Sequence, residues 1–442
     1  MTKKWQPYPT YKDSGVEWLG AIPEHWEMVK FSHFIDFQEG PGIMADDFKD
    51  EGVPLLRITN LKPGYVDIEG CNYLAIDKVE QKWKHFRLLA NDLLISCSAS
   101  TGLVSIVDQK SANSIAYTGI IRLRPARNNI ARDFIRVLVG SDFYFTQINQ
   151  LKTGTTIQHY GPVHLKQIKI PIPPLPEQQK IAQFLDQETS KIDKLITKKE
   201  RLIELLKEKR TALISHAVTK GLNPDVPMKD SGVEWLGKIP EHWKVKRLKF
   251  LTRQIIDGTH FTPTYAVEGV PFLRVTDIQE SVINFEQVKL IPESEHKELI
   301  KRCNPEKGDL LLSKNGTIGV PRIVDWNHKF SIFVSLCLIK VRKLLSVHYS
   351  YYFFLSHEIK SQMSYGTKTN TVMNLHLDKI REFIFTFPPL PEQQKIAQFL
   401  DRETSKIDNL ITKTRTSIDH LKEYRTALIS AAVTGKIDVR EH

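Results

Sequence analysis

A set of polar side chains in turn-rich segments carries the hydrogen-bonding groups that read nucleic-acid bases. Asparagine and glutamine pair with adenine, lysine pairs with guanine, and serine or threonine bonds to bases or phosphate. In the first half of the chain the candidates are Ser98, Ser100, Thr101, Lys152, Thr153, Thr155, Thr156 and Gln158. In the second half they are Thr259, His260, Thr262, Lys314, Asn315, Thr317, Lys368, Thr369 and Asn370. For each of them, a role as a hydrated loop residue or turn cap stays open.

The candidate segments differ between two halves of a chain that otherwise repeats itself. One repeated stretch reads KDSGVEWLG-x-IPEHW, at residues 12–26 and 229–243, and another reads PPLPEQQKIAQFLD, at residues 173–186 and 388–401. The repeat unit is therefore about half of the 442 residues, long enough for a domain of its own. Segments that read different base sequences must themselves differ. Base contacts are therefore expected in the segments whose sequence differs between the two halves.

Short strands should position these segments. From about Lys12 to Pro174 the chain is rich in β-branched residues and in Gly, Pro, Asn and Asp, with one helical stretch near residues 133–149. The second half repeats this frame, since Asp92-Leu93-Leu94 corresponds to Asp309-Leu310-Leu311. Each half is expected to hold one globular domain with strands and helices.

A long amphipathic helix should follow each domain. Residues 177–219 contain no Gly or Pro, and their apolar residues recur at spacings of three, four and seven. The same pattern follows Pro391 and ends before Gly435. Each helix has about 40 residues, and a lone helix of that length with an apolar stripe would be unstable in water. We expect the two stripes to pack together in an antiparallel pair. The alternative is that each helix folds against its own domain.

Residue patterns typical of catalysis are missing from the sequence. The double prolines Pro173-Pro174 and Pro388-Pro389 precede Leu at helix entrances, unlike the Pro-Pro-aromatic loop of an amino-methyltransferase. There is no G-x-x-x-x-G-K-[ST] loop and no H-E-x-x-H motif. Glu358-Ile359-Lys360 resembles a nuclease triplet only in its letters, and is typical of solvated helix surface. We expect a chain without catalytic or metal-binding residues.

The repeated histidines and tryptophans have structural interpretations. His25 and His242 have no Cys or carboxylate cluster nearby in the sequence, so a structural role is favoured over catalysis. Trp18, Trp26, Trp235 and Trp243 could stack on bases, but aromatic residues fixed in both repeats more often anchor a core. We predict that all four tryptophans are core residues.

The composition is that of a globular protein, and its positive charge is a weak indication of an acidic partner. The chain is 41% hydrophobic and 26% charged, with a net charge of +11, which favours nucleic acid only weakly. Four scattered cysteines without a C-x-x-C pair argue against a zinc site and against a disulfide framework. No signal peptide or membrane-spanning stretch is recognisable, so a cytoplasmic location is expected.

The paired motifs resemble those of the DNA-specificity subunits of type I restriction-modification enzymes. The resemblance rests on KDSGVEWLG-x-IPEHW, on PPLPEQQKIAQFLD, and on RTALISHAVTKG at residues 210–221 with RTALISAAVTGK at residues 425–436. It covers essentially the whole chain.

The resemblance implies an α+β protein. Two similar mixed α/β target-recognition domains would be joined by two long antiparallel coiled-coil-like helices with an internal pseudo-twofold. The expected boundaries are 1–175 for the first recognition domain, 176–221 for the first helix, 222–390 for the second domain, and 391–442 for the second helix and C-terminal tail.

The resemblance also implies partners. Each recognition domain would read one half of a split site in double-stranded DNA, and two modification subunits and further restriction subunits would join the chain. S-adenosylmethionine, ATP and Mg²⁺ would bind those subunits, and this chain would bind no cofactor and no membrane. The alternatives left open are a chain with its own methyltransferase or nuclease activity, and a coiled-coil scaffold without a DNA role.

Overall fold

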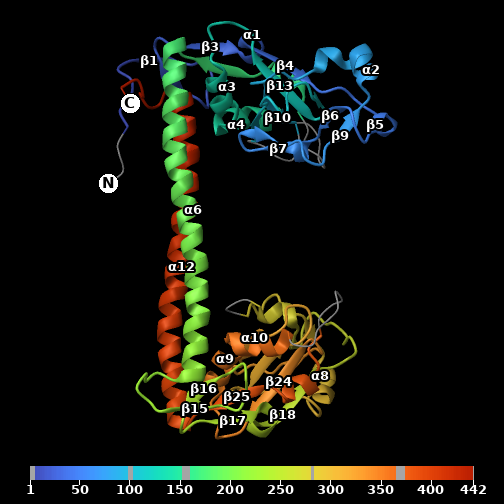
Figure 1. The fold of residues 1–442 in the computed structure, drawn as a ribbon, viewed down its shortest axis with the longest axis vertical. Helices are drawn as coiled ribbons and strands as arrows, with labels where there is room; N and C mark the ends of the chain where they lie inside the picture. Colours follow the sequence, from blue (N-terminus) through green and yellow to red (C-terminus); the bar gives the residue numbers. More distant parts are fainter. Residues whose placement is uncertain (1–4, 98–102, 152–159, 280–282, 365–373, 442) are drawn as a thin grey trace. The chain divides into compact units, whose positions relative to one another are not determined.

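The computed structural model describes residues 5–97, 103–151, 160–279, 283–364 and 374–441. It forms two compact units, each built from a mixed α/β domain and parts of two long helices (Figure 1). Unit 1 comprises residues 1–199 and 416–442, and unit 2 comprises residues 200–415. The predicted boundaries treat the domains and the long helices as separate segments. The compact units instead divide each long helix between them, because each part of a helix packs with the domain beside it.

The domain of unit 1 is built on a four-stranded antiparallel sheet. Its strand order is β11 (Val104–Ile106), β10 (Leu93–Ser96), β13 (Ile120–Pro125) and β4 (Ile35–Glu39). A second sheet has the order β12 (Ile115–Ala116), β6 (Val53–Leu56), β9 (Asn72–Leu74) and β5 (Phe48–Lys49). The remaining strands form the pairs β1 (Tyr11–Asp13) with β2 (Ala21–Pro23), β3 (Glu27–Lys30) with β14 (Lys169–Ile172), and β7 (Leu61–Lys62) with β8 (Tyr65–Val66). The helices include α1 (Phe31–Phe34), α2 (Ile76–Lys78), α3 (Arg132–Val139), α4 (Asp142–Leu151) and α5 (Pro162–Leu165).

The domain of unit 2 repeats this topology. Its main sheet has the order β22 (Pro321–Ile323), β21 (Leu310–Ser313), β24 (Leu336–Val341) and β18 (Thr252–Asp257). The smaller sheets contain β20 (Leu290–Ile291), β19 (Val270–Leu273) and β23 (Ser331–Ile332), then β17 (Lys244–Arg247) with β25 (Ile384–Phe387), and β15 (Met228–Asp230) with β16 (Lys238–Pro240). The helices are α7 (Leu248–Leu251), α8 (Glu293–Leu299), α9 (Val347–Leu355), α10 (His357–Ser364) and α11 (Leu377–Arg381).

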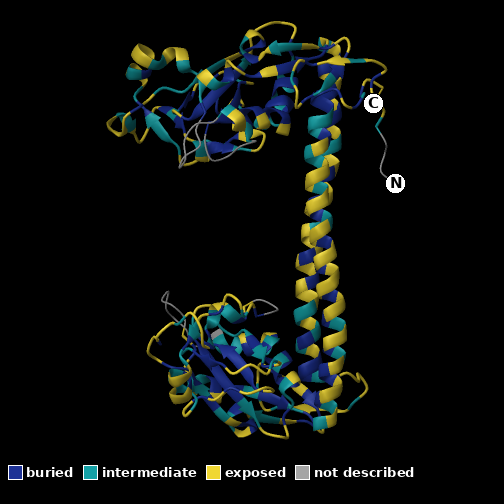
Figure 2. Cartoon of the chain, turned by 180° about the vertical axis from the view of Figure 1, so that it is seen from behind, coloured by how far each residue is buried: buried dark blue, intermediate teal, exposed yellow. Residues whose placement is uncertain are grey.

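Strand register confirms that the two main sheets are equivalent. Leu93 of β10 pairs with Leu123 of β13, and Leu310 of β21 pairs with Ile339 of β24. These pairs occupy matching positions of the repeat, and all four side chains are fully buried. The frame that sequence repetition predicts is therefore confirmed, and the hydrophobic core of each domain lies on its main sheet (Figure 2).

The two long helices are α6 (Leu175–Lys220) and α12 (Leu390–Val433). Each begins after a double proline, and Gly221 ends α6 with a positive φ that favours glycine. The buried residues of their shared stripe are three, four or seven positions apart, as in a coiled coil. In α6 they include Ile181, Leu185, Ile192, Ile196, Ile203 and Leu206, and in α12 Ile396, Leu400, Ile407, Ile411 and Ile418.

Ion pairs fix an antiparallel register within each unit. In unit 1, Asp193 of α6 pairs with Arg425 of α12, and in unit 2, Arg210 of α6 pairs with Asp408 of α12. A later residue of α6 thus pairs with an earlier residue of α12, which makes the helices antiparallel. The predicted fold class is confirmed. The apolar spacing of the sequence also includes Leu195 and Leu202 in the buried stripe, but both side chains are exposed. The face of α6 that contacts α12 is narrower than the set of apolar residues along the helix.

Candidate nucleic-acid interface

The main sheet of unit 2 gathers candidate residues at one edge. Strand β24 runs antiparallel to both β18 and β21, so the carboxyl ends of β18 and β21 lie at the same edge of the sheet. Thr259 follows β18, and Lys314 and Asn315 follow β21. The backbone N–H of Lys314 donates to the Ser335 carbonyl at 2.9 Å, and that of Val334 donates to the Thr259 carbonyl at 2.9 Å, so both loops are tied to the segment just before β24.

A buried carboxylate lies at the centre of this edge. Asp257, the last residue of β18, accepts hydrogen bonds from Lys314 Nζ at 2.8 Å and from Arg302 Nη2 at 2.7 Å. His260 Nε2 lies 3.1 Å from the same carboxylate. Burial by itself would raise the pKa of Asp257, but the bonds from Lys314, Arg302 and His260 outweigh it and lower the pKa to about 2. The group is therefore an ionised carboxylate at neutral pH. We call these four residues the Asp257 cluster.

The cluster presents two of its members to solvent. The side chains of His260 and Arg302 are 64% and 51% exposed, whereas that of Lys314 is only 6% exposed. His260 and Arg302 line a pocket of about 370 Å³ together with Phe261, an exposed aromatic residue. An imidazole, a guanidinium and an aromatic ring are groups that bind base edges and base faces.

The other predicted residues of this edge have different environments. Thr262 is exposed, and Thr317, also exposed, accepts a hydrogen bond from Gln279 Nε2 at 3.1 Å. Asn315 is half-buried, and Thr259 is buried beneath the loop. Lys314 cannot reach a base without leaving Asp257. The contacts of these residues with DNA stay predictions.

Eleven of the predicted site residues lie outside the described residues. They are Ser98, Ser100, Thr101, Lys152, Thr153, Thr155, Thr156, Gln158, Lys368, Thr369 and Asn370.

Sequence reasoning missed Asp257 and Arg302. Arg302 follows α8 and carries no motif, and it reaches the cluster only through the fold. The sequence gives only a weak indication that Asp257 belongs to a site, namely that this charged residue directly follows the apolar residues Ile255 and Ile256.

The matching edge in unit 1 has different chemistry. Gly40 and Gly258 are equivalent, since a Cβ on either would collide with a backbone oxygen, that of Ala116 or that of Ile332 respectively. Glu39 therefore matches Asp257, and it accepts a hydrogen bond from the Gly119 backbone at 3.1 Å. Cys97, whose N–H donates to the Gly119 carbonyl, takes the place of Lys314. The two units thus place different polar groups on the same backbone frame.

The repeated histidines anchor the long helices. His25 Nε2 lies 2.8 Å from Glu177 in the first turn of α6, and His242 Nε2 lies 2.8 Å from Glu392 in the first turn of α12. At the far ends, Lys436 donates to the Leu19 and Ala21 carbonyls, and Lys220 donates to those of Leu236 and Lys238. These contacts favour the structural interpretation of both histidines.

The four tryptophans divide into two classes. Trp26 and Trp243 are fully buried, as predicted for core residues. The prediction is wrong for Trp18 and Trp235, which are 42% and 44% exposed. The motif KDSGVEWLG makes a turn that leaves the first tryptophan at the rim of a pocket, while the second enters the core.

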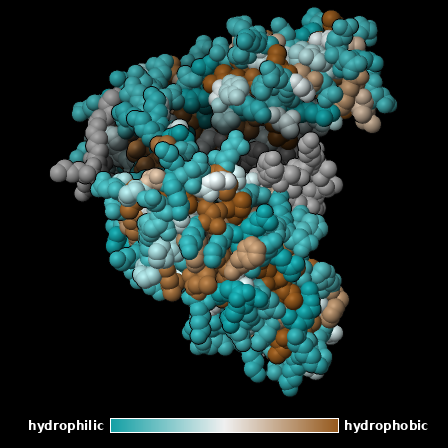
Figure 3. Space-filling model, turned by 60° about the horizontal axis from the view of Figure 1, so that its bottom comes forward, coloured by the Kyte–Doolittle hydropathy of each residue, from teal (hydrophilic) through white to brown (hydrophobic). Residues whose placement is uncertain are grey.

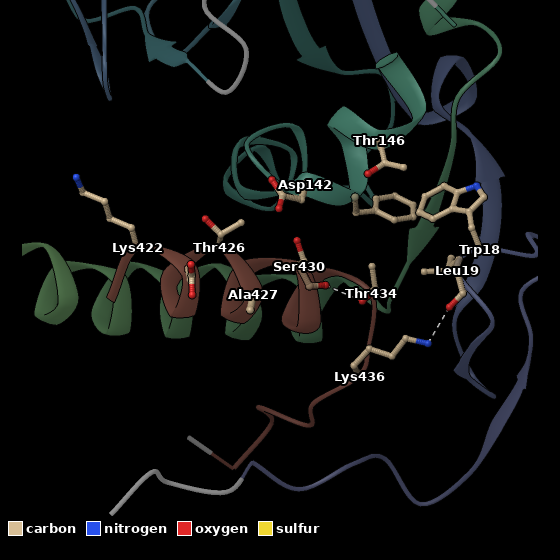
Figure 4. Close-up of a pocket in the computed structure, with 12 residues that line it drawn as sticks. Trp18, Leu19, Asp142, Thr146, Lys422, Thr426, Ala427, Ser430, Thr434 and Lys436 are labelled. Carbon is tan, nitrogen blue, oxygen red and sulfur yellow. Dashed lines mark hydrogen bonds between the residues drawn. The ribbon is translucent and has the colours of Figure 1, made fainter. Parts of the chain in front are cut away.

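Each exposed tryptophan lies beside an open pocket. In unit 1 the pocket has a volume of about 660 Å³ and lies between α4 and α12 (Figure 4). Its lining includes Trp18, Phe143, Asp142 and Ser430, and the ring of Trp18 lies 5.3 Å from that of Phe143. In unit 2, Trp235 lines a pocket of about 680 Å³. The same repeated residue thus borders a pocket in both units.

One face of the molecule is largely polar. The face in Figure 3 is mainly hydrophilic, with hydrophobic residues in small groups. Among the described residues there is no group of three or more His, Cys, Asp or Glu side chains that could hold a metal ion. Within the same ranges, no helix is long and apolar enough to span a membrane.

A family model matches most of the chain. The model of the type I restriction modification DNA specificity domain matches twice, over residues 23–205 and 240–420. Each match includes one globular domain and most of the long helix that follows it.

Curated relatives match over nearly the whole length. The chain is 26% identical to the type I restriction enzyme MjaVIII specificity subunit of Methanocaldococcus jannaschii, covering 95% of this chain and 94% of that one. It is 24% identical to the type I restriction enzyme EcoKI specificity subunit of Escherichia coli, covering 95% and 90%.

Solved structures share the fold. A chain from a study of complex assembly and conformational transition of the type I R-M system aligns with a TM-score of 0.73 at 17% identity, covering 94% of this chain and 99% of that one. The HsdS subunit from Thermoanaerobacter tengcongensis aligns with a TM-score of 0.56 at 17% identity, covering 94% and 98%. With two family-model matches on its two repeated units, this chain belongs to the family of type I restriction-modification DNA-specificity subunits.

Proposed function

We propose that each unit of this chain reads one half of a split site in double-stranded DNA. The observation that carries the proposal is the pair of equivalent sheet edges with unlike side chains. Unit 1 has Glu39 and Cys97 there, and unit 2 has the Asp257 cluster with its exposed His260 and Arg302. Two domains with the same backbone arrangement but different polar side chains are suited to recognising two different DNA sequences. The net charge of +11 favours contact with the phosphates of either half.

Joining two readers in one chain increases discrimination. Each mismatched base pair costs about 1 to 3 kcal/mol, and the costs add for separated positions. Two readers of a few base pairs each therefore reach a specificity that neither has alone.

The long helices are proposed to set the gap between the two half-sites. The repeated ion pairs support this proposal. Asp193 pairs with Arg425 and Arg210 pairs with Asp408, so the two helices have the same antiparallel register in each unit. A helix rises about 1.5 Å per residue. Seven residues inserted into both helices would keep the apolar stripe in phase and lengthen the pair by about 10 Å.

The insertion has defined positions. Leu195 of α6 lies two residues after Asp193, so the antiparallel register places it beside Glu423 of α12, two residues before Arg425. Seven residues should be inserted after Leu195 and seven before Glu423. The insertion should change the gap of the methylated site or abolish methylation. Full methylation with an unchanged gap would refute the spacer role.

We also propose that the chain recruits two modification subunits, one for each unit. Trp18 and Trp235 support this, because they stand at the same position of the repeat and are both exposed, and a partner that binds twice needs the same surface feature twice. The methyltransferase chemistry, with S-adenosylmethionine, and the ATP- and Mg²⁺-dependent restriction chemistry would then belong to partner subunits. This chain itself would act without catalysis.

The test of the proposed function is the methylome of cells that express this chain with its modification subunit. A split sequence methylated in both halves is the expected result. A contiguous methylated sequence would contradict the two-reader proposal. No methylation, together with DNA binding that lacks sequence preference, would favour a scaffold instead.

A further inference from the structure

The inference concerns the Asp257 cluster and rests on the proposed function of unit 2 as a reader of DNA. Asp257 is almost fully buried, yet two of its three partners, His260 and Arg302, are more than half exposed. A buried carboxylate that bonds exposed side chains restrains how those side chains meet a ligand. Lys314 neutralises the carboxylate from the inside and leaves the outer two free to face DNA.

The carboxylate also fixes the tautomer of His260. An ionised carboxylate only accepts hydrogen bonds, so the ring nitrogen that faces it, Nε2, must carry the proton. In the neutral imidazole the other nitrogen, Nδ1, is then an acceptor. Nδ1 of His260, the ring nitrogen that does not face Asp257, is thus a hydrogen-bond acceptor.

Arg302 adds donors beside that acceptor. Its Nη1 donates to the backbone carbonyls of Asp257 and Gly258, both at 2.9 Å, and its Nη2 donates to Asp257 Oδ1. A guanidinium has five N–H donors, so this arrangement leaves Nε and one Nη2 hydrogen outside the cluster. Both exposed groups line the pocket that also contains Phe261.

We propose that Asp257 is a positioning residue for specificity. It holds His260 with Nδ1 as an acceptor, so that unit 2 selects, on the DNA strand that His260 faces, a base with an amino group in the major groove, adenine (N6) or cytosine (N4), over guanine or thymine. Arg302, fixed on the same carboxylate, donates to the neighbouring base or phosphate. Unit 1 has Glu39 and Cys97 at the matching positions and reads its half-site by other means.

The proposal predicts a change of preference rather than a simple loss. In Asp257→Asn the amide can donate to Nε2, which would move the ring proton to Nδ1. His260 would then present a donor, and the preferred base at its position should change to one with an acceptor edge, guanine or thymine. A role in folding alone would weaken binding to all sequences equally.

The experiment is a binding selection with random duplex DNA and the purified full-length chain, followed by sequencing. The wild type should enrich a split sequence. His260→Ala should lose discrimination by about 10-fold or more at one or two adjacent positions of one half-site. The other half-site should stay unchanged. His348→Ala, which removes an exposed histidine of α9 in the same unit, is the matched control and should match the wild type.

His260→Ala protects the test against misfolding. Asp257→Asn leaves Lys314 buried without its counter-charge and can unfold unit 2, whereas the side chain of His260 is mostly exposed. Unchanged preference at every position in His260→Ala would overturn the role of the cluster while leaving the proposed function intact. The absence of any split sequence with the wild type would overturn the proposed function, and the inference with it.

Discussion

Arg425 Nε of α12 lies 2.9 Å from Asp193 Oδ1 of α6, and the repeat reproduces this contact in unit 2, where Arg210 Nε lies 2.9 Å from Asp408 Oδ1. The participating side chains are between 26% and 52% exposed, so water weakens each ion pair. Their main consequence is register, because each pair favours one antiparallel alignment of the two helices.

Arg425→Ala should therefore cost little stability. An exposed ion pair contributes about 0.2 to 1 kcal/mol, and the thermal midpoint of unit 1 should fall by no more than a few degrees. The double exchange Asp193→Arg with Arg425→Asp should restore it. Lys422→Ala, at an exposed position of α12 in the same unit, is the control. Failure of the double exchange to recover the midpoint, measured by calorimetry, would contradict the pairing.

Glu177→Ala should destabilise the chain more than Glu392→Ala. Glu177 is buried and accepts from Tyr8 Oη and from Trp26 Nε1, the latter at 3.0 Å, so its loss leaves two buried donors unpaired. Such a loss costs about 1 to 3 kcal/mol for each group. Glu392 is 31% exposed, and the matching Trp243 Nε1 has no partner within the part of the chain that the structure describes.

Urea denaturation of the two variants measures this difference. Tyr8 itself gives a second readout, because burial and then the bond to Glu177 raise the pKa of its hydroxyl well above the usual value. Spectroscopic titration of the tyrosines should show a lower pKa for Tyr8 in Glu177→Ala, although burial, the larger cause, keeps it above the usual value. Equal loss of stability in the two glutamate variants would show that the repeat is energetically symmetric here.

Acid should remove the stabilisation that Asp257 provides. Burial opposes ionisation of this carboxyl, but Lys314, Arg302 and His260 lower its pKa in the folded protein to about 2, from 3.8. A group whose folded pKa is lowered stabilises the protein above its unfolded pKa, and this contribution is lost as the pH falls from about 4 to about 2.

The lost contribution is on the order of 2 kcal/mol, at about 1.4 kcal/mol for each unit of pKa. Denaturation of the wild type and of Asp257→Asn at pH 5 and at pH 2.5 tests this. The gap in stability between the two proteins should narrow at the lower pH. A constant gap would mean that Asp257 titrates normally in the folded state.

Gly258→Ala should disrupt the edge of the main sheet in unit 2. An added Cβ would lie 1.9 Å from the Ile332 carbonyl oxygen, a backbone atom that cannot move aside as a side chain can. Overpacking of this kind costs about 1 to 3 kcal/mol or more. Gly42→Ala is the control, because nothing lies within 4 Å of its added Cβ. Limited proteolysis should cut unit 2 of Gly258→Ala faster than that of the control, and equal rates would contradict the close approach.

The sequence alone predicted the elements that repeat. Apolar spacing predicted α6 and α12 because a buried stripe requires it, and the double prolines at 173–174 and 388–389 marked where both helices begin. The equivalence of the two domains followed from stretches of sequence that recur at nearly the same shift, 217 residues for the first and 215 for the second. These features are local, so a sequence displays them directly.

The Asp257 cluster could not be predicted in the same way. Its members are far apart in the sequence. The pairing of β18 and β21 with β24 brings residues 257, 260 and 314 together, and Arg302 joins them from the segment after α8. The prediction placed Trp18 in the core because the residue recurs in both repeats. Recurrence shows that both units need the residue, but it does not show whether the side chain is buried or exposed.

The exchange of residues 29–170 for those of a family member with a known site tests the division of labour most directly. These residues contain the whole main sheet of unit 1 and leave α6, α12 and unit 2 untouched. Methylation sequencing of the chimera should show one new half-site, the other half-site unchanged and the same gap. A change in both half-sites, or in neither, would contradict the claim that each unit reads its own half.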